Sequence, residues 1–302
     1  MLRLGTRGSP LALVQANLVR NALLAAHGWA PEMVVIVPIR TTGDKVQDRP
    51  LAEIGGKALW TKELDRALLD SEIDLAVHSM KDVETIRPES IAIAAMLKRE
   101  DVRDRLIGAE SIEVLPHGAR IGTSSPRRAA QVRRIRPDLS IVPLRGNVDT
   151  RLAKVRDGEQ GGIGLAVAGL ERLERPDIGT PIPVDQLLPA PSQGAVGIEV
   201  RADDVTTRML VSAIGDPATE RCVLAERAVL AALSADCHSP VAALATIEDD
   251  TLRLRAEILS EDGSEHVCLD RPGLEGNAHE AAIIAHDLLA AAGPRLRALF
   301  GH

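Results

Sequence analysis

The sequence RLGTRGSP at residues 3–10 returns as RIGTSSP at residues 120–126, and this repeat decides the fold prediction. A single match of this length can arise by chance, whereas several matches in the same order indicate an internal duplication. The sequence therefore predicts two lobes of related build. Two further segments recur in that order, IVPIR (36–40) as IVPLR (141–145) and IDLAVH (73–78) as IGLAVA (163–168).

Each lobe shows strands alternating with helices. Ser9 and Ser125 are N-cap candidates, and each precedes a proline at the first helical position. The strands are short β-branched runs bounded by glycine and proline, which predicts parallel sheets covered on both faces. Ligands of such sheets bind beyond the carboxyl ends of the strands. In the first helix, which Gly28 ends, the predicted apolar stripe is formed by Leu11, Val14, Leu18 and Ala22.

Two breaks in the pattern predict crossovers between the lobes. The first is charged (KRED, 98–101) and the second is rich in proline and glycine (LPAPSQG, 188–194). The apolar run at 195–200 reads as a strand that returns to the first lobe. We expect this double crossover to act as a hinge that permits closure of a cleft between the lobes.

From about residue 216 the pattern changes to a third region. A helix over 218–233 precedes strand-like runs at 241–247, 252–259 and 266–270 and a helix over 277–292. The predicted fold class is α/β, with two doubly wound lobes and a small α+β C-terminal domain that contains an antiparallel sheet. The predicted domains are 1–98 with 195–215, 99–194, and 216–302.

Aromatic residues are almost absent, since the 302 residues include only Trp29, Trp60 and Phe300. Modules that stack bases on aromatic platforms, and aromatic cages for quaternary amines, need more rings than this. The composition therefore excludes these classes and predicts an aliphatic core.

The N-terminal residues and the cysteines favour a cytoplasmic protein. No run reaches 18 apolar residues, and the first residues lack a signal-peptide pattern. The three cysteines are an odd number without CxxC spacing, so we expect neither a disulfide framework nor a metal site. A reducing cytoplasm is the expected location.

Positive charge is concentrated in one part of an acidic chain. Residues 120–156 hold ten Lys or Arg against two acids, although the net charge of the whole chain is −7. A charge run is usually a solvated helix face. Here several arginines follow strands or begin helices, where backbone N–H groups also point outward. The pattern favours a small polyanion in a cleft over a nucleic acid lying on a surface.

Four motifs could carry chemistry. HSMKD (78–82) follows an apolar strand, so its Lys–Asp pair is either a surface pair or a site in which Asp82 protonates a leaving group or stabilises a cation. GTSSPRR (122–128) and RGNVDTR (145–151) combine helix starts with arginines, which suit carboxylate or phosphate. GGKALW (55–60) reads as a loop or helix start and lacks the spacing of a nucleotide-binding P-loop.

Cys237 differs from the other two cysteines in its expected context. Cys222 and Cys268 fall inside predicted regular elements, where a lone cysteine is usually a small buried residue. Cys237 falls in a predicted loop before His238 and could carry a covalent group. A protease nucleophile is the alternative, but no matching His–Asn arrangement is present.

Taken together, these motifs resemble the porphobilinogen deaminase family, also called hydroxymethylbilane synthases. The similar stretches run through nearly the whole chain in the family's order, and VHSMKD with LRGN-x-x-TR is a highly specific combination. The stretches are 5–16, 55–64, 74–83, 122–128, 143–152, 166–173, 192–199 and the loop of Cys237.

The resemblance implies a fold and a reaction. The first two domains would be relatives of two-lobed periplasmic binding proteins and transferrins, and the third would carry a dipyrromethane cofactor as a thioether on Cys237. The family condenses four porphobilinogen molecules head to tail, releases ammonia each time and hydrolyses the product to 1-hydroxymethylbilane for haem synthesis. A cytoplasmic monomer is expected.

The resemblance also assigns roles to residues. Asp82 would be catalytic, because loss of ammonia creates positive charge on a pyrrole nitrogen that a carboxylate can stabilise. The arginines would neutralise the acetate and propionate groups of the substrate. The cofactor-binding residues would be Cys237, Lys81, Ser79, Ser125, Arg127, Arg128, Arg145, Asn147 and Gly194. The substrate-binding residues would be Arg7, Ser9, Lys57, Trp60, Arg151, Arg172 and Gln193.

Some positions differ from the expected family pattern. Ala235 and Asp236 stand before the cysteine where small residues are usual, and a neighbouring carboxylate is expected to slow cofactor attachment. Ala242 replaces a glycine, and Trp60 replaces a phenylalanine. We expect Trp60 to line the cleft and pack against a pyrrole ring, the alternative being a core position.

Two other functions compete with the enzyme. A two-lobed anion-binding or sensor protein would share the duplicated lobes, but neither a signal peptide nor a helix-turn-helix is evident, and the Cys237 domain would have no purpose. A nucleic-acid binder ranks third, because the arginines lack aromatic partners.

Overall fold

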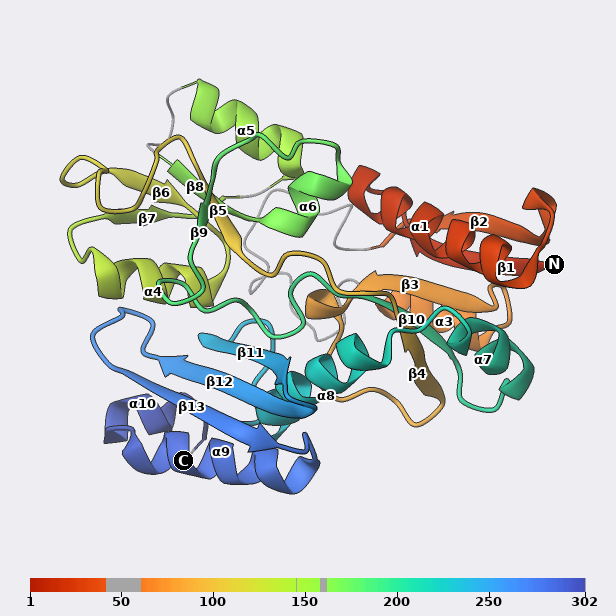
Figure 1. Cartoon of the computed structure of the whole chain (residues 1–302). Helices are drawn as coiled ribbons and strands as arrows, with labels where there is room; N and C mark the ends of the chain where they lie inside the picture. The colour runs from red at the N-terminus through yellow and green to blue at the C-terminus, as the bar shows by residue number, and fades with distance from the viewer. Residues whose placement is uncertain (42–60, 145, 158–161, 302) are drawn as a thin grey trace. The chain divides into compact units, whose positions relative to one another are not determined.

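The computed structural model describes residues 1–41, 61–144, 146–157 and 162–301, with the backbone alone at 162–168. The chain folds into two compact units. Unit 1 contains residues 1–100 and 194–220, and unit 2 contains residues 101–193 and 221–302 (Figure 1). The predicted division into three domains remains a prediction.

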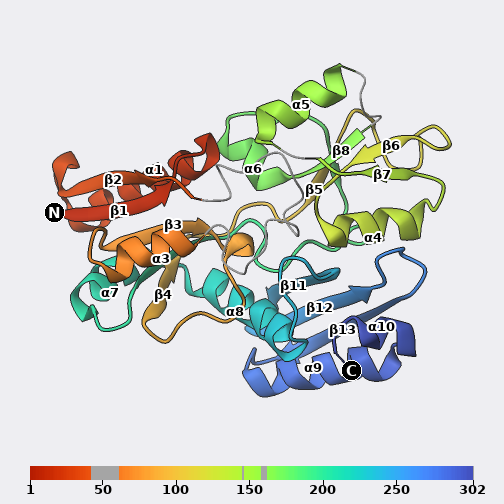
Figure 2. The ribbon, with the colours of Figure 1, turned by 180° about the vertical axis from the view of Figure 1, so that it is seen from behind.

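Unit 1 is a five-stranded sheet in the order β2-β1-β3-β10-β4. β1 runs parallel to β2 and β3, whereas β10 runs antiparallel to β3 and β4. Helices α1 and α3 cover the sheet and are visible from behind in Figure 2. The strands are β1 (Leu2–Arg7), β2 (Val34–Ile39), β3 (Leu75–Ser79), β4 (Ile91–Met96) and β10 (Val196–Arg201); the helices are α1 (Pro10–His27), η1 (Pro31–Met33), α3 (Lys62–Leu69), η3 (Met80–Asp82) and α7 (Val205–Ser212).

The two faces of this sheet have separate apolar cores. On one face, Val19 of α1 and Val211 of α7 pack with Leu75 and Val77 of β3. On the other face, α3 packs against Ala76. The alternation of neighbouring β3 residues between the two cores is the period-two pattern of a strand buried on both sides.

Helix α1 begins and ends as predicted but buries a different stripe. Ser9 accepts a hydrogen bond from the backbone N–H of Ala12 at 3.4 Å, and Gly28 ends the helix in the left-handed region at φ 62°. The predicted stripe is wrong, since Leu18 is 39% exposed. Two apolar stripes offset by one residue are present in this helix, and the one with small alanines lies against the sheet: Ala12, Gln15, Ala16, Val19 and Leu23.

Unit 2 contains a second five-stranded sheet, in the order β7-β6-β8-β5-β9. β6 is parallel to β7 and β8, and β5 is antiparallel to β8 and β9. Val132 of α4 packs into one core, and Leu152 of α5 and Leu170 of α6 pack into another. The elements are β5 (Asp104–Ile107), β6 (Arg120–Gly122), α4 (Pro126–Ile135), β7 (Ser140–Val142), α5 (Val148–Arg156), β8 (Gly162–Ala166), α6 (Val167–Arg172) and β9 (Thr180–Ile182).

The two strand orders confirm the duplication, because β1, β2 and β3 hold the same places in their sheet as β6, β7 and β8 hold in theirs. The expectation of wholly parallel sheets is wrong. In each lobe the antiparallel fourth strand, β10 or β5, follows a crossover from the other half of the chain rather than a helix within the lobe. The registers also differ, since Gly5 lies opposite Ala76 whereas Gly122 lies opposite Ile163.

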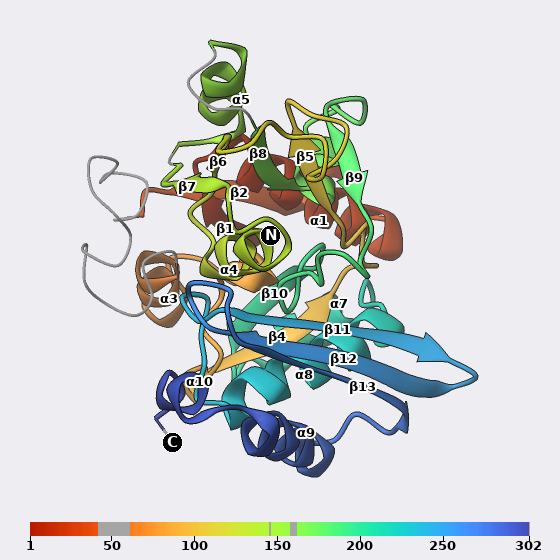
Figure 3. The same cartoon turned by 90° about the vertical axis from the view of Figure 1, so that its left-hand side faces the viewer.

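The C-terminal part of unit 2 is the predicted antiparallel sheet with helices. Its core joins α8, the sheet, α9 and Phe300. Figure 3 shows α8 and α9 beside the three strands. The predicted fold class, α/β lobes with a small α+β domain, is confirmed. The elements are α8 (Pro217–Ala232), β11 (Val241–Glu248), β12 (Thr251–Leu259), β13 (His266–Leu274), α9 (Ala278–Ala291) and α10 (Pro294–Ala298).

The second crossover is tied down within unit 2 along most of its length. The buried Glu226 of α8 accepts the backbone N–H of Ser192 at 2.6 Å, and the N–H of Ala243 donates to the carbonyl of Pro189 at 3.2 Å. These hydrogen bonds hold Pro189 and Ser192 within unit 2, and the hinge expected from the double crossover stays a prediction. Among the described residues, no helix is long and apolar enough to cross a membrane.

Candidate functional site

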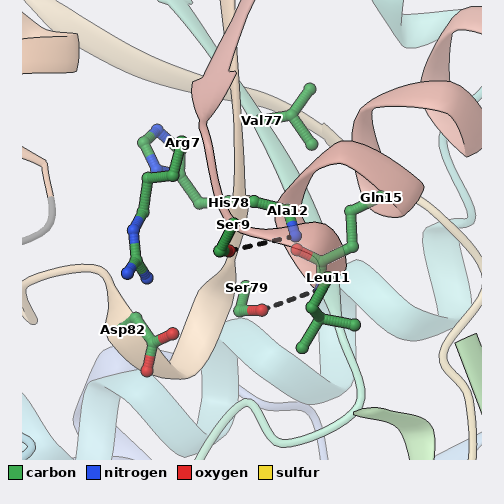
Figure 4. Close-up of a pocket in the computed structure, with 9 residues that line it drawn as sticks. All are labelled: Arg7, Ser9, Leu11, Ala12, Gln15, Val77, His78, Ser79 and Asp82. Atoms are coloured by element: carbon green, nitrogen blue, oxygen red, sulfur yellow. Dashed lines mark hydrogen bonds between the residues drawn. The ribbon is translucent and has the colours of Figure 1, made fainter. Parts of the chain in front are cut away.

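A pocket lies in unit 1 where β1 and β3 end and α1 begins. This is the carboxyl edge of two parallel strands, where the sequence predicted a site. Figure 4 shows the Arg7 guanidinium and the Asp82 carboxylate directed toward the same space. The pocket is lined by Arg7, Ser9, Leu11, Ala12, Gln15, Val77, His78, Ser79 and Asp82.

Local hydrogen bonds hold the walls of this pocket. The side chain of Gln15 donates to the Ser79 hydroxyl at 2.8 Å, which connects α1 to the end of β3. The Thr6 hydroxyl donates to the carbonyl of Ala12 at 3.2 Å, which fixes the turn between β1 and α1. Ser9 caps α1 and faces the pocket at the same time. The hydroxyls of Ser9 and Ser79 are thus held in place by the fold.

The short helix η3, which carries Asp82, packs against β10. The backbone N–H of Met80 donates to the carbonyl of Ala195 at 3.1 Å. The buried Met80 side chain packs over Gly197, where an added Cβ would lie 1.9 Å from the sulfur. Only glycine leaves room for this contact. The half-buried Asp82 therefore takes its position from β10 as well as from β3.

Behind the pocket lies a buried cluster of charges. His78 Nε2 is 3.1 Å from Glu199 Oε2, a close contact without a well-aligned hydrogen bond, and these side chains are only 4% and 0% exposed. Arg87 donates to Glu199 from Nε at 2.8 Å and from Nη2 at 3.0 Å. Burial alone would raise the pKa of Glu199, but His78 and Arg87 outweigh it and hold that pKa at about 2.

Arg87 connects this cluster to α3 and to the segment after Asp82. Its guanidinium donates to Asp65 at 2.6 Å and to Glu84 at 2.5 Å. Burial of Asp65 raises the pKa of that carboxyl despite the arginine. In this cluster three carboxylates surround one guanidinium, so negative charge is in excess. This excess favours a cation nearby.

In unit 2, the paired arginines of α4 are buried on an acid. Arg127 Nη2 donates to Asp104 at 2.7 Å, and Arg128 Nη2 donates to the other oxygen at 2.6 Å. Asp104 is fully buried, which would raise its pKa, but the two guanidiniums hold that pKa far below its usual range. Two cations on one carboxylate leave an excess of positive charge, although both arginines already have a protein partner.

Further buried groups extend this arginine cluster. Gln193 donates to Asp104 at 2.8 Å and to the carbonyl of Val102 at 2.7 Å. Gln131 of α4 donates to Glu257 of β12 at 2.8 Å. Sequence reasoning missed Asp104, Glu199 and Glu257 as important residues. An acid inside a mostly apolar strand was the signal that could have identified Glu199, whereas Asp104 begins its strand and Glu257 lies in a strand with two arginines, so neither gave such a signal.

The remaining predicted residues of unit 2 occupy strand ends and helix starts. Ser125 caps α4 by accepting from the N–H of Arg128 at 3.4 Å, and Asn147 caps α5 by accepting from Thr150 at 3.0 Å. Arg151 donates to the carbonyl of Gly146 at 2.9 Å. The cap by Ser125 confirms the prediction, the cap by Asn147 is a finding of the structure, and each satisfies a backbone N–H in the first turn of its helix.

Four predicted residues are brought into one pocket, namely Arg7, Ser9, Ser79 and Asp82. Lys81 is half-buried in η3 beside that pocket, and the half-buried Arg172 ends α6. Gly194 adopts φ 83° at the start of the return to unit 1, a conformation that favours glycine. Lys57, Trp60 and Arg145 lie outside the described residues.

The Cys237 turn lies between α8 and β11. Cys237 is exposed, and the Asp236 carboxylate accepts the N–H of His238 at 2.8 Å. The Ser239 hydroxyl accepts the N–H of Asp236 at 3.1 Å. The unexpected Asp236 thus shapes the turn that presents the thiol. An Asx-type turn of this kind is a usual role of aspartate.

The other cysteines have different surroundings. Cys222 is buried in α8, as expected, whereas the same expectation is wrong for Cys268, which lies on the exposed face of β13. The Cys268 residue is exposed overall but its sulfur is partly shielded from water, and this shielding and the nearby Glu257 raise the pKa of Cys268. Among the described residues, no three His, Cys, Asp or Glu side chains form a group that could hold a metal ion.

Comparison with family models matches almost the whole chain. Residues 2–209 match "Porphobilinogen deaminase, dipyromethane cofactor binding domain". Residues 220–290 match "Porphobilinogen deaminase, C-terminal domain".

Curated relatives agree with these matches. The chain is similar to porphobilinogen deaminase of Sphingopyxis alaskensis, with 57% identity over 99% of this chain and 96% of the relative. It is 52% identical to that of Paracoccus denitrificans over 90% and 88%, and 48% identical to that of Nitrobacter winogradskyi over 98% and 95%. Similar solved structures include a periplasmic substrate-binding protein from Coxiella burnetii, with TM-score 0.44, 16% identity and coverage of 73% of this chain and 94% of that chain.

Proposed function

The chain belongs to the porphobilinogen deaminase family, and from this premise we propose how its residues carry out the reaction. The family's enzymes are transferases of tetrapyrrole synthesis that use a dipyrromethane cofactor. They join four porphobilinogen molecules head to tail, release ammonia at each condensation and hydrolyse the product to 1-hydroxymethylbilane. Family membership favours this activity over a binding or sensor protein without chemistry.

Asp82 is the catalytic carboxylate in this proposal. When ammonia leaves the substrate, positive charge develops on the pyrrole nitrogen, and a carboxylate at that nitrogen lowers the barrier. The same carboxylate can accept the proton lost when the next carbon–carbon bond is made. The single observation that carries the assignment is the pocket shared by Asp82, Arg7, Ser9 and Ser79 at the ends of β1 and β3.

Arg7 and the hydroxyls have a complementary role. Porphobilinogen carries an acetate and a propionate, and a guanidinium forms paired hydrogen bonds with a carboxylate. If Arg7 and Ser9 bind these groups, Asp82 remains available for the cation. Further substrate contacts are proposed for Lys57, Trp60, Arg151, Arg172 and Gln193.

The cofactor is proposed to be attached to Cys237. A thioether to a two-ring pyrrole needs an exposed sulfur, which excludes the buried Cys222; of the two exposed cysteines, Cys237 lies in a turn and Cys268 inside β13. The positive excess around Asp104 suits the cofactor's carboxylates, so the residues present fit the group. When bound, dipyrromethane supplies the pyrrole carbon from which the product chain grows. Residues proposed to hold it are Lys81, Ser79, Ser125, Arg127, Arg128, Arg145, Asn147 and Gly194.

Intact-mass spectrometry of the purified holoprotein tests the attachment. Wild type is expected to carry one dipyrrole increment and to colour with Ehrlich's reagent. Cys237→Ser should lack both, whereas the control Cys268→Ser should keep both. Equal masses for wild type and Cys237→Ser, apart from the substitution itself, would refute the attachment to this residue.

A cytoplasmic location and a monomeric state are part of the same proposal. An exposed cysteine such as Cys237 stays reduced, and so able to form a thioether, in a reducing compartment. Sedimentation at several protein concentrations tests the oligomeric state, and a mass that rises with concentration would contradict the monomer.

A further inference from the structure

Each lobe contains one fully buried carboxylate on its antiparallel strand. Glu199 lies on β10 opposite Ala76, and Asp104 lies on β5 opposite Ala166. The internal sequence repeat aligns these two alanines with each other. The duplicated scaffold thus keeps an acid at a matching place in both lobes, where each acid needs cationic partners to offset the cost of burial.

The partners of the two acids differ in one informative respect. Asp104 is satisfied by the guanidiniums of Arg127 and Arg128 together with Gln193. Glu199 receives two hydrogen bonds from Arg87, and His78 is the third neighbour at 3.1 Å. The repeat places an alanine, Ala168, where the first lobe has His78. A buried acid in this scaffold therefore does not require a histidine beside it.

His78 connects Glu199 to the pocket. It lines the same pocket as Asp82 and immediately precedes Ser79, which α1 holds through Gln15. Its ring contacts Glu199 on β10, the strand on which Met80 is also mounted. Two contacts to β10, one on each side of Ser79, thus fix the chain that leads to Asp82.

We propose that Glu199 is a positioning residue for the chemistry at Asp82, acting through His78. The Glu199 carboxylate holds the His78 imidazole against β10. This contact fixes the end of β3 and thereby the position of the Asp82 side chain in the pocket. This inference rests on the proposed role of Asp82. It assigns to Glu199 an effect on turnover rather than on substrate binding, because Arg7 and Ser9 come from β1 and the start of α1, and β3 lies between β1 and the strand of Glu199.

The charged groups around His78 are consistent with this role. Glu199 faces it from β10, and Asp82 and Arg7 share the pocket with it. Arg87 and Asp65 stand behind Glu199. A purely structural ion pair would instead affect stability and leave the rate constant of the folded enzyme unchanged, which provides a way to separate the two roles.

Steady-state kinetics of ammonia release by the holoenzyme provides the test. Glu199→Gln keeps the shape of the side chain and is expected to lower kcat at least tenfold, with KM within twofold of wild type. The matched control is Asp74→Asn, which removes the half-buried partner of Arg3 just before β3 begins, at the end of that strand away from the pocket, and should keep kcat within twofold. If Glu199→Gln keeps wild-type kcat, or if both variants lose kcat equally, the proposal is overturned.

His78 variants keep the proposal testable if Glu199→Gln fails to fold. His78→Leu should lower kcat as Glu199→Gln does, whereas His78→Gln, which retains an N–H donor toward Glu199, should recover part of the loss. The double variant Glu199→Gln/His78→Leu should be no slower than the slower single variant, because the two residues act as one unit. A folded His78→Leu with wild-type kcat overturns the proposal.

Asp82→Asn, measured in parallel, separates this proposal from the proposed function. If Asp82→Asn keeps wild-type kcat, the proposed catalytic role of Asp82 fails, and the positioning role of Glu199 fails with it. If it is inactive while Glu199→Gln and His78→Leu keep wild-type kcat, only the positioning role fails.

Discussion

The two lobes share one strand order, but the charged cluster around the buried acid has a negative excess in one lobe and a positive excess in the other. In unit 1, Arg87 faces three carboxylates, those of Asp65, Glu84 and Glu199. In unit 2, Asp104 faces two guanidiniums. A negative excess stabilises a cation and a positive excess stabilises an anion. The duplication thus supplied one scaffold twice, and a few buried charges give one copy a negative excess and the other a positive excess.

The largest expected effect comes from removing the proposed catalytic carboxylate of unit 1. Asp82→Asn should lower kcat for ammonia release by about 10²–10⁴-fold, the usual contribution of a general acid or base. Its free energy of unfolding should change by less than about 0.5 kcal/mol, because Asp82 is only half-buried. The control Asp70→Asn, at the exposed end of α3, should be fully active. A nearly unchanged kcat in Asp82→Asn would refute the division of roles between the lobes.

The corresponding change in unit 2 should affect stability first. Asp104→Asn leaves two buried guanidiniums without their counter-charge and should cost about 3–5 kcal/mol in the free energy of unfolding. The comparison variant is Asp101→Asn, whose partner Arg103 is largely exposed, and which should cost less than about 1 kcal/mol. Urea denaturation measures both. Equal losses would mean that the buried arginine cluster does not depend on its acid.

Acid should destabilise the protein through the buried carboxylates of Asp104 and Glu199. Both have a pKa below the ordinary value in the folded state, so the unfolded chain binds more protons and stability falls as pH is lowered. For Glu199, the loss should run from about pH 4.5 to its folded pKa of about 2 and amount to about 3 kcal/mol.

Urea denaturation at a series of pH values between 5 and 2 measures this loss. Glu199→Gln should show a smaller dependence on pH over this range than wild type. Parallel stability curves for the two proteins would contradict the low pKa assigned to Glu199.

The smallest expected effects come from the two matching helix caps. Ser9→Ala and Ser125→Ala should each cost about 0.5–1 kcal/mol in thermal or urea unfolding, since both hydroxyls accept a long hydrogen bond of 3.4 Å. Ser9→Ala should also raise KM for porphobilinogen, because Ser9 lines the Asp82 pocket. A cap in one lobe that cost several times more than its counterpart would show that the repeated helix starts are not equivalent.

Local features of the sequence predicted much of this fold and part of the site. Ser9, Pro10 and Gly28 delimit α1 as expected, because capping and backbone preferences act within a few residues. The Asp82 pocket was also predictable, since carboxyl ends of parallel strands meet at one edge. The buried stripe of α1 was not, because two offset stripes are similarly apolar and only the sheet selects between them.

The sequence by itself determined the duplication, the helix starts, the three-stranded C-terminal sheet and the motifs that carry the family resemblance, because these are written in short-range patterns and repeats. Only the tertiary structure decided that Arg127 and Arg128 turn inward onto Asp104, and that His78 meets Glu199 behind the pocket. Such pairs join segments far apart in the chain. Their energy depends on burial and on which charges face each other, and neither quantity exists until the strands have been placed side by side.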